Sequence, residues 1–169
     1  SRTFGEEVHH FSVLAQALST YAAMCGAKLR KQESCAGIIT IFILTNPFKR
    51  QYRMNYKGLR TIRLNTPTND SMEIVSATMA SLRNIYRRDC VYKKAGVIAS
   101  GIVDQSHVQL SFFDNIEDIE KRHRIMQAVD ALNDSLGRMK IRFAINGFES
   151  KCNLKQEHLS PSYTTRMDE

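Results

Sequence analysis

The chain has 169 residues and is 43% hydrophobic and 24% charged, which is typical of a soluble globular protein. Its longest apolar run, residues 36–44, is too short to span a bilayer, and its N-terminus lacks the hydrophobic segment of a signal peptide. The chain starts with Ser1 rather than methionine, so we expect a fragment of a longer protein. Four cysteines without zinc-binding spacing predict reduced thiols in the cytosol: Cys25, Cys35, Cys90 and Cys152.

The net charge of +7 is distributed unevenly along the chain. Residues 1–104 contain 15 lysines and arginines against 7 aspartates and glutamates, whereas residues 105–169 contain 9 against 10. The whole basic excess therefore belongs to the first part of the chain. This asymmetry predicts a polyanionic partner for that part alone.

Residues 1–103 predict six elements in the order strand, helix, strand, strand, helix, strand. Apolar residues at three- and four-residue steps indicate a helix over 11–31, and Asp70 and Glu73 indicate a capping box at the start of the second helix. The predicted strands are residues 1–7, 36–45, 59–65 and 94–103. This order is the split βαββαβ arrangement of an α+β fold, in which a four-stranded sheet has both helices on one face and its other face open.

The remaining residues predict a linker and a small α/β extension. Residues 104–116 interrupt the pattern, and residues 117–136 predict a helix that Gly137 ends. The apolar stripe of this helix is Ile125, Val129, Leu132 and Leu136. Alternating Ile141, Phe143 and Ile145 predict a strand over 140–145 with these side chains inward. We therefore divide the chain into domain 1–103, linker 104–116 and extension 117–169.

A basic segment, residues 49–63, contains six lysines and arginines and no acid. Within its strand, Ile62 and Leu64 alternate with Thr61, Arg63 and Asn65, which places a hydrogen-bonding row on the open face. Such groups suit the phosphate oxygens of nucleic acid; the alternative is a solvated strand face. The candidate DNA-binding residues are Arg2, Thr3, Lys57, Arg60, Thr61, Arg63, Lys93 and Lys94.

Recognition of single-stranded RNA by a sheet of this topology needs aromatic side chains on the central strands. Strand 59–65 has none, and Phe42 would be alone on the open face. Contacts with the backbone of a duplex therefore fit better than base stacking.

The sequence contains no recognisable pattern of catalytic residues. The one acidic cluster, Asp114, Glu117, Asp118 and Glu120, falls at a helix start, where the helix dipole favours negative charge. The five histidines are scattered, and the glycines form no phosphate-binding loop. We expect no catalytic residue, no metal site and no cofactor in this fragment.

Gln109, Leu110, Ser111, Phe112 and Phe113 form an apolar segment in the linker. A short extended peptide of this kind can insert apolar anchors into a pocket of a partner protein, while a glutamine amide forms fixed hydrogen bonds. The alternative is an edge segment that packs on its own domain.

Taken in order, the segments SRTFG, TNPF, LNTPTNDS and YKKAGV resemble the C-terminal region of UmuC-type Y-family polymerases, the catalytic subunits of the bacterial SOS mutagenic polymerase. QLSFF, the helix MQAVDALNDSLGR and the ending LSPSYTTRMDE resemble the extreme C-terminus of the same family. The resemblance covers essentially the whole chain, and the ending is its most specific part.

The resemblance implies a little-finger domain in residues 1–103, which in this family holds both DNA backbones. QLSFF is similar to the family's sliding-clamp motif, with Gln109 as polar anchor and Leu110 and Phe113 as apolar anchors. The extension resembles a UmuC-specific segment, for which we expect contact with a UmuD-type accessory subunit. The palm domain and its Mg²⁺-binding carboxylates are absent, so the resemblance implies a cytoplasmic bacterial polymerase whose C-terminal fragment does not synthesise DNA.

Two other functions stay open from the residues alone. A ferredoxin-like regulatory domain that senses a small molecule has the same topology; it predicts ligand-dependent dimerisation and no salt-sensitive DNA binding. An enzyme with a site formed from scattered residues predicts a well-formed pocket that contains a group with a strongly shifted pKa.

Overall fold

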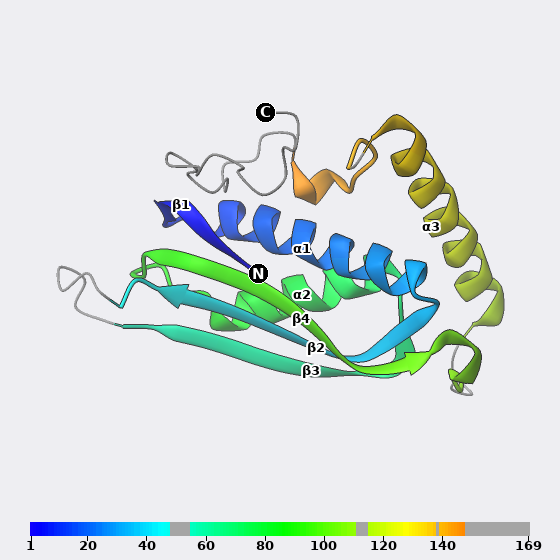
Figure 1. Cartoon of the computed structure of the whole chain (residues 1–169). Coiled ribbons are helices and arrows are strands. Elements are labelled where there is room, and N and C mark those ends of the chain that lie inside the picture. The colour runs from blue at the N-terminus through cyan, green and yellow to red at the C-terminus, as the bar shows by residue number, and fades with distance from the viewer. Residues whose placement is uncertain (48–54, 111–114, 138, 148–169) are drawn as a thin grey trace, which may run out of the picture.

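The computed structural model describes residues 1–47, 55–110, 115–137 and 139–147. In these ranges a four-stranded antiparallel sheet has the strand order β1-β4-β2-β3, and helices α1 and α2 cover one of its faces (Figure 1). The elements of this domain are β1 (Arg2–Val8), α1 (Phe11–Lys31), β2 (Ser34–Thr45), β3 (Lys57–Thr68), α2 (Ser71–Ile85) and β4 (Tyr92–Asp104). The predicted α+β fold is confirmed.

β2, β3 and β4 are longer than predicted, whereas β1 keeps the predicted length of seven residues and is displaced by one. We had expected Thr66 and Pro67 to end β3, but the strand continues through them. β3 lies at the edge of the sheet, where a proline disrupts no pairing on the solvent side. β4 likewise begins at Tyr92 and ends at Asp104.

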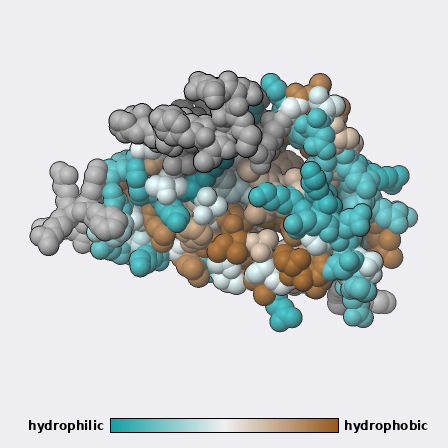
Figure 2. All heavy atoms as spheres, viewed as in Figure 1, coloured by the Kyte–Doolittle hydropathy of each residue, from teal (hydrophilic) through white to brown (hydrophobic). Residues whose placement is uncertain are grey.

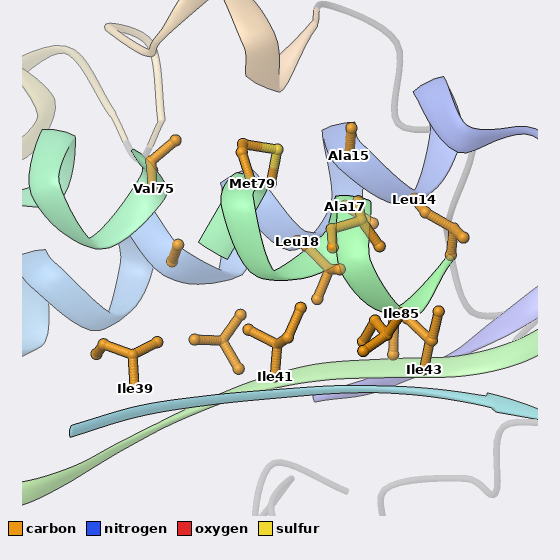
Figure 3. Close-up of a cluster of buried hydrophobic side chains, with 14 of the residues drawn as sticks. Leu14, Ala15, Ala17, Leu18, Ile39, Ile41, Ile43, Val75, Met79 and Ile85 are labelled. Carbon is orange, nitrogen blue, oxygen red and sulfur yellow. The ribbon is translucent and has the colours of Figure 1, made fainter. Parts of the chain in front are cut away.

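The hydrophobic core lies between the helices and the sheet (Figure 3). Ile39, Ile41 and Ile43 alternate along β2 and point toward the helices, which contribute apolar residues such as Leu14 and Leu18 of α1. Because a strand directs successive side chains to opposite faces, the residues between these isoleucines lie on the other face of β2. No helix of the domain covers that face.

The start of α2 differs in detail from the predicted capping box. Asp70 is the N-cap, and its carboxylate accepts a hydrogen bond from the Met72 amide at 2.8 Å. The Asp70 amide donates to Thr68 Oγ1 at 3.1 Å, while the Glu73 carboxylate pairs with Arg122 of the next helix at 2.9 Å. Glu73 therefore binds a distant helix instead of completing the local box.

Helix α3 (Ile116–Leu136) confirms the predicted helix, but its orientation is unexpected. Met126 is its only buried residue, whereas Leu132 is 44% and Leu136 60% exposed. Ile125, Leu132 and Leu136 of the apolar stripe are exposed because an adjacent face of the helix, with Met126 at its centre, packs on the domain. On that face Asp130 pairs with Arg30 of α1 at 2.6 Å, and Arg122 pairs with Glu73 of α2.

The strand predicted over residues 140–145 is wrong. The Asn133 side chain accepts from the Ile141 amide at 2.8 Å and donates to the Ile141 carbonyl at 3.0 Å. These backbone groups would otherwise pair with a neighbouring strand, and the described part of the chain places no strand beside them. A short 3₁₀ turn, Ala144–Asn146, follows.

None of the described helices is long and apolar enough to cross a membrane.

Candidate nucleic-acid interface

The open face of the sheet is organised in rows of side chains that run across the strands. Residues directly opposed in an antiparallel pair lie on the same face, so the register assigns each row. At one end of the face, Leu44 pairs with Lys57 of β3 and Lys94 of β4, and Lys94 pairs with Thr3 of β1. This first basic row therefore contains two lysines and a threonine hydroxyl.

The second basic row lies toward the other end of β3, where Ile38 pairs with Arg63 and Ser100. Lys57 and Arg63 are separated by about 20 Å of extended strand, at about 3.3 Å per residue. In the described part of the chain, neither basic row contains an acidic residue, and Lys57, Arg63 and Lys94 form no ion pair. The cationic groups of both rows are therefore available to an external anion.

Uncharged residues occupy the two rows between the basic ones. Thr40 pairs with Thr61, and their hydroxyl oxygens lie 2.9 Å apart. Phe42 pairs with Leu59, whose side chain is 65% exposed. Hydrophobic side chains accordingly reach the surface over the strands of the sheet (Figure 2). Phe42 is thus outside the core, as predicted, but it lies beside Leu59 rather than alone.

Three of the eight predicted residues lie apart from these rows. Arg2 pairs with buried Ala95 and Arg60 with buried Ile41, so both project from the helix-bearing side at the two edges of the sheet. Lys93 lies at an irregularity of β4, and its ammonium group donates to the Gly5 carbonyl at 3.1 Å. The structure therefore brings together Thr3, Lys57, Thr61, Arg63 and Lys94 on the open face. The loop residues Lys49, Arg50 and Arg53 lie outside the described residues.

The linker begins with a short turn. Asp104 caps a 3₁₀ turn, Gln105–His107, and hydrogen bonds from Ser106 hold the pKa of this carboxyl below its usual range. Gln109 and Leu110 follow in an exposed position, with Leu110 42% exposed. Ser111, Phe112 and Phe113 lie outside the described residues.

The acidic residues at the start of α3 lie at a helix N-terminus, as the sequence indicated. Asn115 is the N-cap, and its side chain accepts hydrogen bonds from the amides of Glu117 and Asp118. Asp114 is outside the described residues. Within the described ranges, no group of three or more His, Cys, Asp or Glu residues could hold a metal ion.

One surface hollow could suggest a small-molecule site. It lies between the end of β3, the start of α2 and helix α3, and Cys35 and Arg122 contribute to its lining. Burial raises the pKa of the Cys35 thiol, which disfavours the thiolate that a nucleophilic cysteine needs. The hollow therefore gives no specific support to an enzyme site.

Sequence reasoning missed the apolar centre of the open face. Leu59 of β3 and Ile98 of β4 are large and exposed on the open face, and the residues before and after each of them point to the other face of the sheet. The alternation of β3 could have placed Leu59 with Thr61 and Arg63, because residues two apart along a strand point to the same face. A leucine in such a row is normally assigned to the core, so the signal was misleading.

Comparison with known families addresses the identity of this domain. The model of the impB/mucB/samB family C-terminal domain matches residues 1–112, which include the whole sheet and both covering helices.

The chain belongs to the impB/mucB/samB family.

The curated relatives agree with this assignment. Protein UmuC of Salmonella typhimurium is 35% identical over 166 residues, Protein SamB of the same organism 33% over 166, and Protein MucB of Escherichia coli 32% over 165. Each match covers 98% of this chain but only 39%, 39% and 38% of the respective relative. The chain is therefore a UmuC-type C-terminal region and spans about two fifths of the length of these impB/mucB/samB proteins.

A second model, "Domain of unknown function (DUF4113)", matches residues 123–169. It begins inside α3, beyond the residues that the impB/mucB/samB model matches.

Proposed function

We propose that this chain is the DNA-binding and clamp-docking end of an error-prone translesion DNA polymerase of SOS DNA repair. Membership of the impB/mucB/samB family supports a polymerase as the longer protein. The polymerase chemistry and its Mg²⁺ ions would belong to a palm domain outside this chain. The function of the chain itself is then to hold template-primer DNA and to be recruited to it.

The observation that supports DNA binding most strongly is the spacing of the two basic rows on the open face. The roughly 20 Å between Lys57 and Arg63 exceeds the width of the major groove of B-DNA, which is about 12 Å. Cations at this spacing can reach phosphates on both sides of one groove, while Leu59 and Thr61 span the space between them. Phosphate contacts position a protein without reading sequence, which suits a polymerase that copies damaged template.

Removal of the two rows tests the proposed interface. In a Lys57→Gln/Arg63→Gln variant we expect weaker binding to a labelled duplex and a salt slope reduced by about 0.9 for each lost phosphate contact. Fluorescence anisotropy over a range of salt concentrations measures both quantities. Arg83→Gln, an exposed charge on α2 on the other side of the sheet, is the matched control. If the control and the double variant lost equal affinity for the duplex, the open face would not be part of the DNA interface.

We further propose that residues 109–113 dock in a pocket of the bacterial sliding clamp. The exposure of Leu110 supports this proposal, because an apolar anchor must be accessible before binding. A Gln109→Ala/Leu110→Ala/Phe113→Ala variant should lose binding to a purified clamp. Ile116→Ala, which removes an exposed apolar side chain just beyond the segment, should retain it. Full binding by the triple variant would rule out this docking site.

The exposed stripe of α3 is the surface that we propose for a UmuD-type accessory subunit. Ile125, Leu132 and Leu136 are each more than two fifths exposed and lie on one side of the helix. Amphipathic helices use such stripes for docking in apolar grooves of partner proteins.

A further inference from the structure

The turn between α2 and β4, residues 86–91, presents two arginines at the end of the sheet where β3 begins (Figure 1). Arg87 and Arg88 are both exposed, and neither forms an ion pair with any described residue. The turn contains a single carboxylate, that of Asp89. The turn therefore carries a net positive charge that no described residue neutralises.

The core holds the backbone of this turn in place, because Arg87 is hydrogen-bonded at both of its backbone polar groups. The hydroxyl of buried Tyr92 accepts from the Arg87 amide at 2.8 Å and donates to the Arg87 carbonyl at 3.0 Å. The Cys90 amide also donates to that carbonyl, at 3.4 Å. The point from which the Arg87 side chain projects is therefore fixed.

The side chain of Arg87 is positioned as well. Its guanidinium carbon lies over the ring of Tyr56, 4.3 Å from the centroid, which is a cation–π contact. The Tyr56 hydroxyl donates to the Ile85 carbonyl at 2.7 Å, and the Tyr56 amide donates to Thr45 Oγ1 at 2.9 Å, so the ring is itself fixed. Because the N–H donors of a guanidinium group point outward in its plane, contact with a ring leaves them free to bind an oxyanion.

This arginine lies beside the first basic row. Tyr56 immediately precedes Lys57, which brings that row to the edge of the sheet, since β3 is an edge strand. No described strand lies beyond this edge, and Arg87 lies against the Tyr56 ring there. The cations Lys94, Lys57 and Arg87 thus follow one another from β4 across the open face and round the edge of β3.

We propose that Arg87 and Arg88 form a phosphate-binding site that extends the DNA contact of the first basic row round the edge of β3. The proposal rests on the proposed DNA-binding role of the open face and adds contacts to the strand whose backbone Lys57 reaches. A guanidinium group binds phosphate oxygens through two parallel hydrogen bonds, which suits this ligand class. An arginine that is already held in place loses less conformational entropy on binding than a freely moving one, so Tyr56 acts as a positioning residue.

A purely structural role for Arg87 predicts a different result. If its guanidinium group only covers the Tyr56 ring, loss of the group lowers the free energy of unfolding and leaves DNA binding unchanged. Urea unfolding and DNA binding, measured on the same variants, separate the two roles.

Fluorescence anisotropy with the full 169-residue chain and a labelled blunt duplex tests the site. In an Arg87→Gln/Arg88→Gln variant we expect affinity at least about threefold weaker and a salt slope reduced by about 0.9 for each lost phosphate contact. Arg83→Gln is the matched control; it removes an exposed arginine of the last turn of α2 that makes no cation–π contact with a described residue, and should bind like the wild type.

A conservative substitution tests whether the positioning of Arg87 matters beyond its charge. Arg87→Lys keeps the charge but removes the planar set of donors, so affinity should fall about twofold or more while the salt slope stays unchanged. Tyr56→Leu, which removes the ring beneath the guanidinium group, should have the same effect. An Arg87→Lys variant that binds like the wild type would contradict a positioned site.

A second probe, the same duplex with a single-stranded overhang, assigns the phosphate. Equal losses on both probes would place the bound phosphate in the duplex, and a loss confined to the overhang probe would place it in the single strand. If Lys57→Gln/Arg63→Gln weakens binding but Arg87→Gln/Arg88→Gln weakens it on neither probe, this site is overturned and the open-face interface stands. A wild-type chain without salt-dependent DNA binding would overturn both.

Discussion

At the scale of single residues, Tyr92 shows how a polar group is accommodated in the core. Its ring is fully buried, and its hydroxyl accepts from the Arg87 amide at 2.8 Å and donates to the Arg87 carbonyl at 3.0 Å. Tyr56 and Tyr86 pack against the ring, with centroids 6.4 Å and 5.9 Å away. Burial raises the pKa of Tyr92 well above its usual value.

The raised pKa of Tyr92 predicts a loss of stability in alkali. An unfolded tyrosine releases its proton near pH 10, whereas native Tyr92 keeps it. The resulting stabilisation is complete below about pH 10 and is lost as the pH rises toward the native pKa. Tyr92→Phe should lower the free energy of unfolding at neutral pH by about 1–2 kcal/mol, through the lost hydrogen bonds, but should decline less steeply above pH 10. Urea unfolding at several pH values measures both effects, and parallel pH profiles would contradict the assignment.

At the scale of elements, the docking of α3 depends on Arg30. Its side chain is only 7% exposed, and its guanidinium group donates to both carboxylate oxygens of Asp130, at 2.6 and 2.8 Å. The same group also donates to the Asn69 carbonyl and to Ser71 Oγ. A single arginine on α1 thus joins the start of α2 to the middle of α3.

Loss of the Asp130 carboxylate should therefore loosen α3. Asp130→Ala leaves the buried guanidinium group of Arg30 without its anion. The loss of a partner by a buried polar group lowers the free energy of unfolding by about 1–3 kcal/mol. We expect faster amide hydrogen exchange along α3, with α1 unchanged. Asp134→Ala, an exposed carboxylate one turn further along α3, should have little effect. Equal exchange in both variants would mean that the pair does not hold the helix.

Local patterns predicted most of the elements but not how α3 packs. The helix over residues 11–31 was placed correctly because Leu14 and Leu18 recur at helical spacing on the side that packs against the sheet. α3 has an equally regular stripe, but partners distant in sequence bind an adjacent face, around Met126. The alternation at 141–145 failed for a similar reason, since a strand requires a neighbour that periodicity cannot show.

The candidate site was partly predictable from the same kind of local pattern. Alternation along β3 correctly grouped Thr61 with Arg63 on one face. It could not place Arg2 or Lys93, because their positions depend on how β1 pairs with β4 across most of the sequence.

At the scale of the whole molecule, the charge distribution and the uncovered sheet face both favour binding to a polyanion. The basic excess lies in residues 1–104, and the structure gathers part of it in two rows at opposite ends of an uncovered sheet face. The helices α1 and α2 lie behind that face (Figure 1). A DNA duplex on the open face would therefore leave α3 accessible to protein partners.

The most direct test of this account is the binding constant of the intact chain for duplex DNA as a function of salt, measured with several unrelated sequences. We predict that log K falls linearly with log salt concentration, with a slope of about −0.9 for each contacted phosphate, and that the slope and affinity are the same for every sequence. Binding that is insensitive to salt, or that differs widely between sequences, would contradict a backbone-binding role for the open face.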